Sequence, residues 1–105
     1  MKQRYSYHDD LITRLKNPNY AMGYLKASFD DPNPRVFLLA LKDVIEATGG
    51  ITKFSRLSKI PRITLYRILS KRGNPEFFTL ANLLHTLGLK LTVIKEKNSS
   101  FKHAA

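Results

Sequence analysis

The chain of 105 residues contains no cysteine and no tryptophan. Without cysteine it has no disulfides, iron–sulfur clusters, cysteine zinc sites or thiol catalysis. No apolar run approaches the roughly 18–20 residues of a membrane span, and the N-terminus MKQRYSYHDD lacks the apolar core of a signal peptide. We therefore expect a cytoplasmic protein with no membrane partner. Its length suits a single domain, residues 1–96, followed by a flexible polar tail, residues 97–105.

Acidic residues are absent from the middle of the chain. Residues 49–75 hold seven Lys or Arg and no Asp or Glu, whereas residues 1–48 hold seven basic and six acidic residues. The whole chain has 18 basic and 8 acidic residues, which gives a net charge of +10. Basic residues that only kept the protein soluble would not exclude acids from one segment. The pattern therefore indicates contact with a polyanion, of which DNA is the leading candidate.

Helix signals recur through the N-terminal half, residues 8–48. We expect Asp9 to cap a short helix that ends near Lys16. Asn17-Pro18 and Asn33-Pro34 each combine a capping side chain with a proline at the first helical position. The helix after the second proline is the most apolar of the chain, and Gly49-Gly50 ends it. The apolar residues that predict it to be the central core helix are Phe37, Leu41, Val44 and Ile45.

The acid-free segment, residues 49–75, predicts two short helices joined by a tight turn. The first helix is expected from Lys53 to about Leu57 with Thr52 as its cap, and the second from Ile63 to Ser70. Helices that cross at a steep angle need fixed apolar positions and a small residue where their backbones approach. We assign the small residue to Ser55. The expected inward residues are Phe54, Ile60, Leu65 and Ile68.

The remaining residues of the second helix then face outward, where a recognition helix reads base edges. Arg62 and Arg67 are the candidates for bidentate contact with guanine. Thr64 is a candidate for donation to a base or contact with a thymine methyl, and Ile63 for an apolar methyl contact. Tyr66 either packs its ring on the domain or reaches a phosphate with its hydroxyl. The predicted phosphate contacts are Lys53, Arg56, Lys59, Tyr66, Lys71 and Arg72.

The last segment, residues 76–96, predicts a helix and then a strand. Thr79 is the expected cap, Gly88 is the expected residue after the helix end, and the residues between follow the helical template. Leu89, Leu91 and Val93 then alternate with Lys90, Thr92 and Ile94, which predicts a strand. Since no other strong strand is visible, we expect it to pair with the same strand of a second subunit; the alternative is an extended arm that packs alone. The apolar stripe of the helix is Leu80, Leu83, Leu84 and Leu87.

A resemblance to a known family spans about residues 8–96. It is carried by the run GGITKFSRLSKIPRITLYRILSKRGNPEFFTLANLLHTLGLKLTV, which resembles the Cro/repressor-like helix-turn-helix of addiction-module antidote proteins, the antitoxins of HigA type. The upstream run LITRLKNPNYAMGYLKASFDDPNPRVFLLALKDVIEATGG resembles the N-terminal half of that family. The distinctive marks are YL at 24–25, FLLAL at 37–41, LYR at 65–67, GNP at 73–75 and TL…LLHTLGLKL at 79–91.

The resemblance implies a mainly α, five-helix DNA-binding antitoxin that neutralises a RelE/HigB-like ribonuclease toxin. It also implies repression of its own operon, commonly as a homodimer on double-stranded operator DNA. Two residues depart from the family pattern. Lys59 stands where the turn usually has Gly, so we expect a left-handed residue there at some energetic cost. Pro61 stands where the recognition helix usually has a Ser or Asn cap, so that helix lacks a side-chain cap.

Other chemistry is not indicated by the sequence. The pairs Asp9-Asp10 and Asp30-Asp31 fall at helix ends, where capping explains them better than acid–base or metal chemistry. The histidines at 8, 85 and 103 are far apart and lack ligand spacing, and the glycines form no phosphate loop. We therefore expect no enzyme activity, no cofactor and no metal. A stand-alone repressor without a toxin partner and an RNA-binding module remain the alternative functions.

Overall fold

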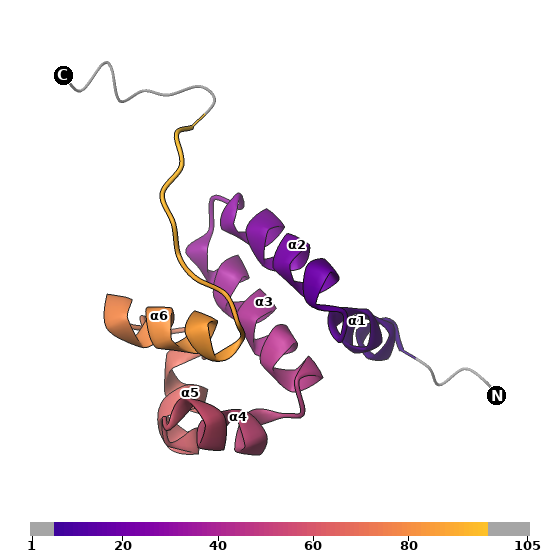
Figure 1. Cartoon of the computed structure of the whole chain (residues 1–105), viewed down its shortest axis with the longest axis vertical. Helices are drawn as coiled ribbons and strands as arrows, with labels where there is room; N and C mark the ends of the chain where they lie inside the picture. The colour runs from indigo at the N-terminus through magenta and orange to yellow at the C-terminus, as the bar shows by residue number, and fades with distance from the viewer. Residues whose placement is uncertain (1–5, 97–105) are drawn as a thin grey trace.

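Six α-helices and no β-strand make up the part of the chain that the structure, a computed structural model, describes, residues 6–96 (Figure 1). The mainly α class predicted from the sequence is confirmed, with one helix more than the resemblance implied. None of the described helices is long and apolar enough to cross a membrane. The helices are α1 (Tyr7–Leu15), α2 (Pro18–Phe29), α3 (Pro34–Ala47), α4 (Ile51–Ser58), α5 (Arg62–Ile68) and α6 (Phe77–Thr86).

Capping side chains fix the starts of the first three helices. The Asn17 side chain accepts from the amide of Asn19 at 2.9 Å, and the Asn33 side chain accepts from the amide of Arg35 at 2.9 Å, with proline following each asparagine as expected. The prediction for α1 is wrong by three residues. Ser6 is its cap and Asp9 is the third helical residue, and the two form a reciprocal capping box.

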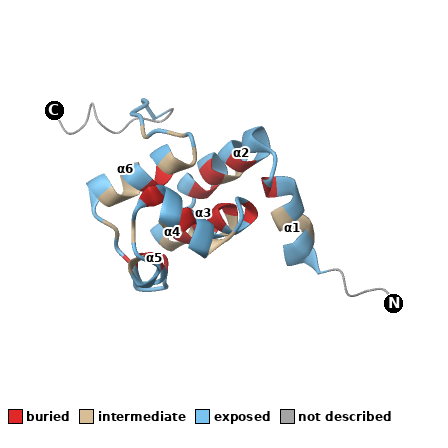
Figure 2. Cartoon of the chain, turned by 60° about the horizontal axis from the view of Figure 1, so that its bottom comes forward, coloured by how far each residue is buried: buried red, intermediate tan, exposed pale blue. Residues whose placement is uncertain are grey.

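Helix α3 is the centre of the core, as its apolar spacing predicts. It packs against α1 and α2 and also against α4, which itself contacts α5 and α6. Figure 2 shows buried residues along α3 with the other helices around it. Leu41 is fully buried, and Ser28 of α2 is buried with its hydroxyl donating to the carbonyl of Leu25 at 2.7 Å. The other predicted core residues of α3, namely Phe37, Val44 and Ile45, are also buried.

Helix α6 begins two residues before the expected cap. Glu76 occupies the capping position without a side-chain hydrogen bond, and Thr79 lies within the first turn, so the prediction for Thr79 is wrong. The apolar stripe is confirmed, because Leu83 and Leu84 are buried and the other two leucines of the stripe are partly buried against the core. Gly88 follows the helix end with a φ of 81°, which is the left-handed conformation that favours glycine at this position.

Residues 89–96 form neither helix nor strand and run as a drawn-out trace in Figure 1. Leu89 and Leu91 are partly buried against the core, whereas Val93 and Ile94 are 94% and 82% exposed. The strand predicted here is therefore not formed in the single chain, because the described residues provide no neighbouring strand to complete its backbone hydrogen bonds. The segment is an arm that leaves the helical body beyond α6 (Figure 1). The predicted tail, residues 97–105, lies outside the described residues.

Candidate nucleic-acid interface

The acid-free segment folds into two short helices, α4 and α5, joined by the turn Lys59–Pro61. Helix α4 begins at Ile51, earlier than expected, because Gly49 and Gly50 turn the chain with φ values of 118° and 96°. Gly50 occupies the capping position, so α4 begins without a side-chain cap. Thr52 lies inside the first turn of α4, so its predicted capping role is wrong. We refer to residues 50–73 as the α4–α5 unit.

The turn between the two helices is held by hydrogen bonds from three sides. The amide of Lys59 donates to the carbonyl of Ser55 at 2.9 Å, and the Ser55 hydroxyl donates to the carbonyl of Ile60 at 2.5 Å. The side-chain amide of Asn82, in α6, donates to the carbonyl of Ser58 at 3.1 Å. Ser55 therefore holds the turn through its hydroxyl, its predicted role as the small residue between the helices stays a prediction, and α6 supports the turn from outside the α4–α5 unit.

Both departures from the family pattern have the local geometry expected of them. Lys59 is the one residue other than glycine with a positive φ among the described residues, at 63° with ψ 27°. Pro61 precedes α5 without a side-chain cap, and its carbonyl accepts from the amide of Leu65 at 3.0 Å. Because Pro61 already has an extended conformation, α5 begins at Arg62, one residue before the predicted start. Helix α5 ends at Ile68 rather than Ser70.

The inward residues of the α4–α5 unit are those predicted. Phe54 is 1% exposed, Leu65 is fully buried, Ile68 is 5% exposed, and Ile60 is partly buried against the core. Burying large side chains such as Phe54 and Leu65 is worth about 1.5–3 kcal/mol each, which fixes the two helices relative to each other and to the domain. The outward direction of the remaining side chains follows from this packing.

The outer surface of α5 carries basic and apolar side chains together. Arg62 and Arg67 are exposed, Ile63 is 79% exposed and Tyr66 is 55% exposed. The exposure of Tyr66 favours contact between its hydroxyl and a phosphate over packing of its ring on the domain. Thr64 is partly buried, which makes it the least accessible of the four residues predicted to contact bases. The base contacts themselves stay predictions.

Arg62 has a partner that the sequence did not reveal. Its Nη1 donates to the hydroxyl of Thr52 at 3.0 Å, so the first residue of α5 is tied to the first turn of α4. Both side chains are exposed, and the contact places the guanidinium at the junction of the two helix N-termini. Thr52 therefore accepts a hydrogen bond from Arg62 instead of capping α4. The two residues lie ten positions apart, and only the turn brings them together.

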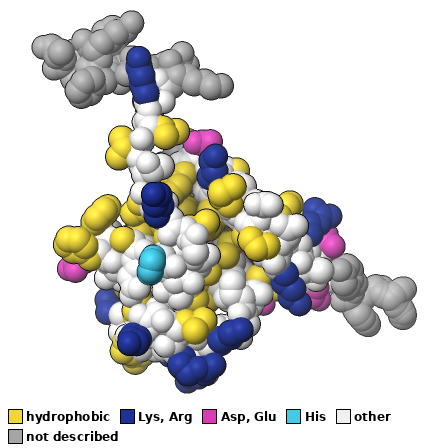
Figure 3. All heavy atoms as spheres, viewed as in Figure 1, with side chains coloured by type: hydrophobic (Ala, Val, Ile, Leu, Met, Phe, Trp, Pro, Cys, Tyr) yellow, Lys and Arg dark blue, Asp and Glu magenta, His cyan; other side chains and the backbone are white. Residues whose placement is uncertain are grey.

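The residues predicted to contact phosphates are all exposed and lie on α4, on the turn, on α5 and on the loop after α5. Within residues 6–96, none of the basic side chains of the α4–α5 unit forms an ion pair, so their charges face solvent. Figure 3 shows Lys and Arg side chains gathered at the bottom of the molecule, over α4 and α5. A positively charged surface attracts polyanions and repels cations. The exposed basic residues are Lys53, Arg56, Lys59, Arg62, Arg67, Lys71 and Arg72.

The loop after α5 is anchored by Gly73. A Cβ on Gly73 would lie 2.0 Å from the carbonyl oxygen of Ile68, so no larger residue fits without a backbone shift. The Gly73 amide donates to the carbonyl of Ser70 at 2.9 Å, and its carbonyl accepts from the guanidinium of Arg35 in α3. This close approach fixes Lys71 and Arg72 at the end of the unit.

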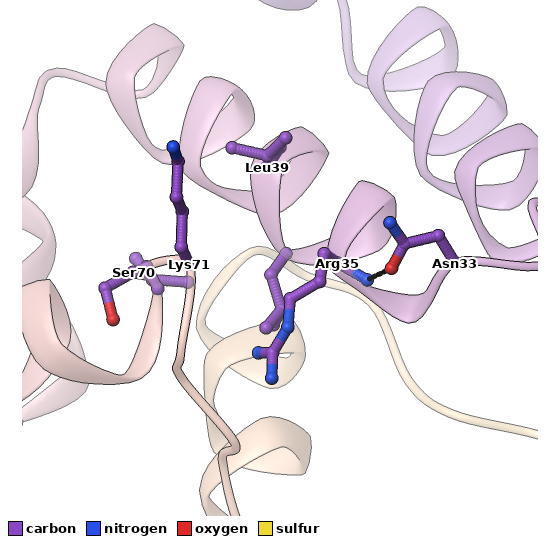
Figure 4. A pocket seen from close by; sticks show the side chains of 7 residues that line it. Asn33, Arg35, Leu39, Ser70 and Lys71 are labelled. Carbon is purple, nitrogen blue, oxygen red and sulfur yellow. Dashed lines mark hydrogen bonds between the residues drawn. The ribbon is translucent and has the colours of Figure 1, made fainter.

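A hollow lies between the start of α3 and this loop (Figure 4). Leu38, Leu39 and Leu69 form its apolar lining, and Arg35 and Lys71 bring two basic side chains to it. Figure 4 shows Arg35 and Leu39 projecting from α3 toward the loop that carries Ser70 and Lys71. No carboxylate or histidine is among the residues that line the hollow.

Comparison with known proteins identifies the family. The model of a family described as "Probable addiction module antidote protein" matches residues 7–95. The chain belongs to this family of antidote proteins. A protein of Haemophilus influenzae (strain ATCC 51907 / DSM 11121 / KW20 / Rd), described as "Uncharacterized protein", is 30% identical over 84 residues, which cover 80% of this chain and 86% of that protein. No solved structure matches the chain.

Membership of the antidote family supports an antitoxin role and implies a toxin partner. It agrees with the antidote resemblance read from the sequence, and it covers both the α4–α5 unit and the N-terminal helices. For this antidote protein the sequence missed Thr52 and Gly73 as residues that shape the basic surface. Gly73 belongs to the GNP mark quoted above, and a glycine next to a basic turn is a signal for close backbone approach. No comparable local signal marks Thr52 as the partner of Arg62.

Proposed function

We propose that this antidote protein is a sequence-specific DNA-binding antitoxin, in which the α4–α5 unit is a helix-turn-helix and α5 is the recognition helix. The observation that carries the proposal is the outer surface of α5, where basic and apolar side chains are exposed together and acidic ones are absent. Side chains of these types suit base edges in the major groove. The supporting basic residues around α5 suit the phosphates on both sides of the groove.

Charge alone gives the expected salt dependence of this binding. Each phosphate neutralised by Lys or Arg contributes about −0.9 to the slope of log K against log salt concentration. If five of the basic side chains of the α4–α5 unit contact phosphates in one protomer, the slope is about −4 to −5. A slope of this size and a clear preference for one duplex over others are the two signatures of the proposed mode.

The first experiment measures binding of the full chain to the DNA upstream of its own gene. Fluorescence anisotropy at several salt concentrations compares this duplex with a scrambled duplex and with double-stranded RNA of the same length. We expect the chain to bind the upstream duplex more tightly than the scrambled duplex by a factor of about 10³ or more. Equal affinity for DNA and RNA would contradict the proposal and favour the RNA-binding alternative. Lys26→Ala is the matched control, because Lys26 is exposed on α2, which does not pack against α4 or α5.

The toxin partner is proposed to be a RelE/HigB-like ribonuclease, and the N-terminal half is proposed to contact it. The support is the family membership together with apolar side chains that α1, α2 and α3 leave exposed. Exposed apolar residues are common on protein surfaces and also occur in the other half of this chain, so the proposal rests on the family membership and on the nearly balanced charge of residues 1–48. The exposed apolar residues of α1, α2 and α3 are Tyr7, Tyr20, Met22, Phe29 and Leu39.

The second experiment tests the toxin directly. The chain is co-expressed with the product of the neighbouring gene, with an affinity tag on that product only. A stable complex and relief of growth inhibition are expected for the antitoxin. If no complex forms while operator binding is retained, the stand-alone repressor becomes the function. Met22→Asp tests the surface, since a charge at a contact with the partner weakens binding whereas a charge on a free surface does not.

Repression of the toxin operon is proposed to require a homodimer formed through the arm, residues 89–96. The support is the absence of helix in the arm and the exposure of Val93 and Ile94, which pairing with a second arm would cover. A symmetric dimer with two recognition helices places its half-sites about 34–36 Å apart, which is one turn of DNA. Removing residues 92–105 is expected to give a monomer in analytical ultracentrifugation. A truncated chain that remains a dimer would contradict pairing through the arm.

A further inference from the structure

A second cluster of functional side chains lies outside the α4–α5 unit, where α1 packs on α3. His8, from α1, and Asp43 and Glu46, from α3, bring one potential ligand atom each to within 4.8 Å of one another. The Nε2 of His8 lies 3.2 Å from Oε1 and 3.3 Å from Oε2 of Glu46. The histidine lies 38 positions before Glu46, which explains why ligand spacing in the sequence gives no sign of the cluster.

The distances suit a first-row divalent ion. Zinc lies about 2.0–2.2 Å from histidine nitrogen and carboxylate oxygen, so neighbouring donors of a tetrahedral site are about 3.3–3.5 Å apart. The separation of His8 and Glu46 is already close to this value. The remaining donor, on Asp43, lies within 4.8 Å of the other two and must move closer to them when an ion binds. The side chains of His8 and Glu46 are each 51% exposed, which leaves access for an ion and for a water as fourth ligand.

The carboxylate of Asp43 is oriented by a second contact. The hydroxyl of Tyr24, in α2, donates to its Oδ2 at 2.9 Å. Hydrogen bonds of this kind hold metal-binding carboxylates in place and tune their affinity. Asp43 and Glu46 are three residues apart on one face of the core helix α3, which is a rigid support.

An ion pair between His8 and Glu46 is the simpler reading of this cluster. It accounts for Glu46 and for contact between α1 and α3. It does not involve the second carboxylate, that of Asp43, which accepts from Tyr24 and has an oxygen within 4.8 Å of the other two ligand atoms. Imidazole and carboxylate donors together suit zinc and its neighbours in the first row better than magnesium or calcium.

We propose that His8, Asp43 and Glu46 bind one Zn²⁺-like divalent ion, with water completing the coordination. The ion joins α1 to α3 and thereby stabilises the N-terminal part of the domain, because a ligand that binds the folded state alone raises its stability. The proposal does not depend on DNA binding, since the α4–α5 unit contributes none of the three ligands. It differs from the sequence expectation that the chain has no metal site.

The test is isothermal titration calorimetry at pH 7.5. The full chain is first freed of metals with a chelator and is then titrated with ZnCl₂. We expect one equivalent to bind, and His8→Gln and Asp43→Asn to weaken that binding at least tenfold. Tyr24→Phe keeps all three ligands and is expected to weaken binding by about 10–100-fold. His85→Gln is the matched control, because His85 is an exposed histidine on α6, away from the cluster.

A second measurement separates metal binding from loss of fold. Zinc is expected to raise the thermal midpoint of the wild type and of His85→Gln, and to leave the midpoint of His8→Gln unchanged. Circular dichroism checks that each variant is helical before the titration. Wild-type chain that binds no zinc would overturn the proposal. Binding that is equally strong in His8→Gln and wild type would also overturn it, because the zinc is then held adventitiously elsewhere.

Discussion

Replacing Lys59 with glycine tests how the turn between α4 and α5 is built. A residue with a side chain loses roughly 1–2 kcal/mol in the left-handed conformation, because its Cβ approaches the following carbonyl oxygen. Lys59 has this conformation at φ 63°. Glycine removes that cost but loses about 0.5–1 kcal/mol through the larger entropy of its unfolded chain. We therefore expect Lys59→Gly to stabilise the domain by about 0.5–1 kcal/mol.

The comparison with Lys59→Ala isolates the backbone contribution. Alanine removes the same charge and the same flexible side chain but keeps the Cβ, so it retains the cost of the left-handed turn. The Lys59 side chain makes no hydrogen bond or ion pair with any of residues 6–96, which means that its loss alone changes stability little. Thermal unfolding followed by circular dichroism measures both variants. The thermal midpoint of the glycine variant should rise by about 2–8 °C relative to the alanine variant.

The outcome that would refute this reasoning is a glycine variant no more stable than the alanine variant. The turn would then be held so firmly by the hydrogen bonds of Ser55 and Asn82 that its conformation is not the source of strain. DNA binding gives a separate readout, since both variants lose the same positive charge. If Lys59 contacts a phosphate, both variants reduce the salt slope by about one, whatever their stability.

Four further substitutions test the surface and its support. Arg67→Ala should weaken operator binding by about 1–3 kcal/mol and relax base preference, measured by anisotropy with single-base variants of the operator; unchanged binding would remove Arg67 from the reading surface. Lys71→Ala should keep base preference and lower the salt slope by about one, and an unaltered slope would show that Lys71 makes no phosphate contact. Gly73→Ala should destabilise the domain by about 1–3 kcal/mol in urea unfolding, because its Cβ would collide with a backbone carbonyl 2.0 Å away, and a neutral effect would show that the loop shifts freely. Phe54→Ala should cost about 3–5 kcal/mol of unfolding free energy, since Phe54 is 1% exposed, and a loss below 1 kcal/mol would place it outside the core.

Local sequence signals predicted the features that depend on neighbouring residues. The two Asn-Pro pairs gave the starts of α2 and α3 because cap and proline act on the helix that directly follows them. Helical spacing gave the buried faces of α3 and α6. The left-handed conformation at Lys59 was predicted from the family resemblance, because Lys59 stands where that turn usually has Gly.

Single capping residues were less informative where the helix could also begin at an earlier residue. Thr52 and Thr79 have suitable hydroxyls, yet both helices begin earlier, at Ile51 and Phe77. For α4 the two glycines upstream turn the chain before Thr52 is reached. For α1 the signal was present, since Ser6 and Asp9 have the spacing of a capping box. Apolar and polar residues do alternate after Gly88. A strand also requires a partner strand, so one segment of sequence does not decide whether a strand forms.

The sequence by itself determined the helical class, the core faces, the single sign of charge between Gly49 and Pro75 and the antidote resemblance. These follow from residue type and local spacing, which act over one or two turns of chain. Only the tertiary structure placed Arg62 on Thr52, Arg35 on Gly73, and His8 beside two carboxylates of α3. Such contacts join residues that are 10 to 38 positions apart, and packing of whole helices decides which side chains then meet.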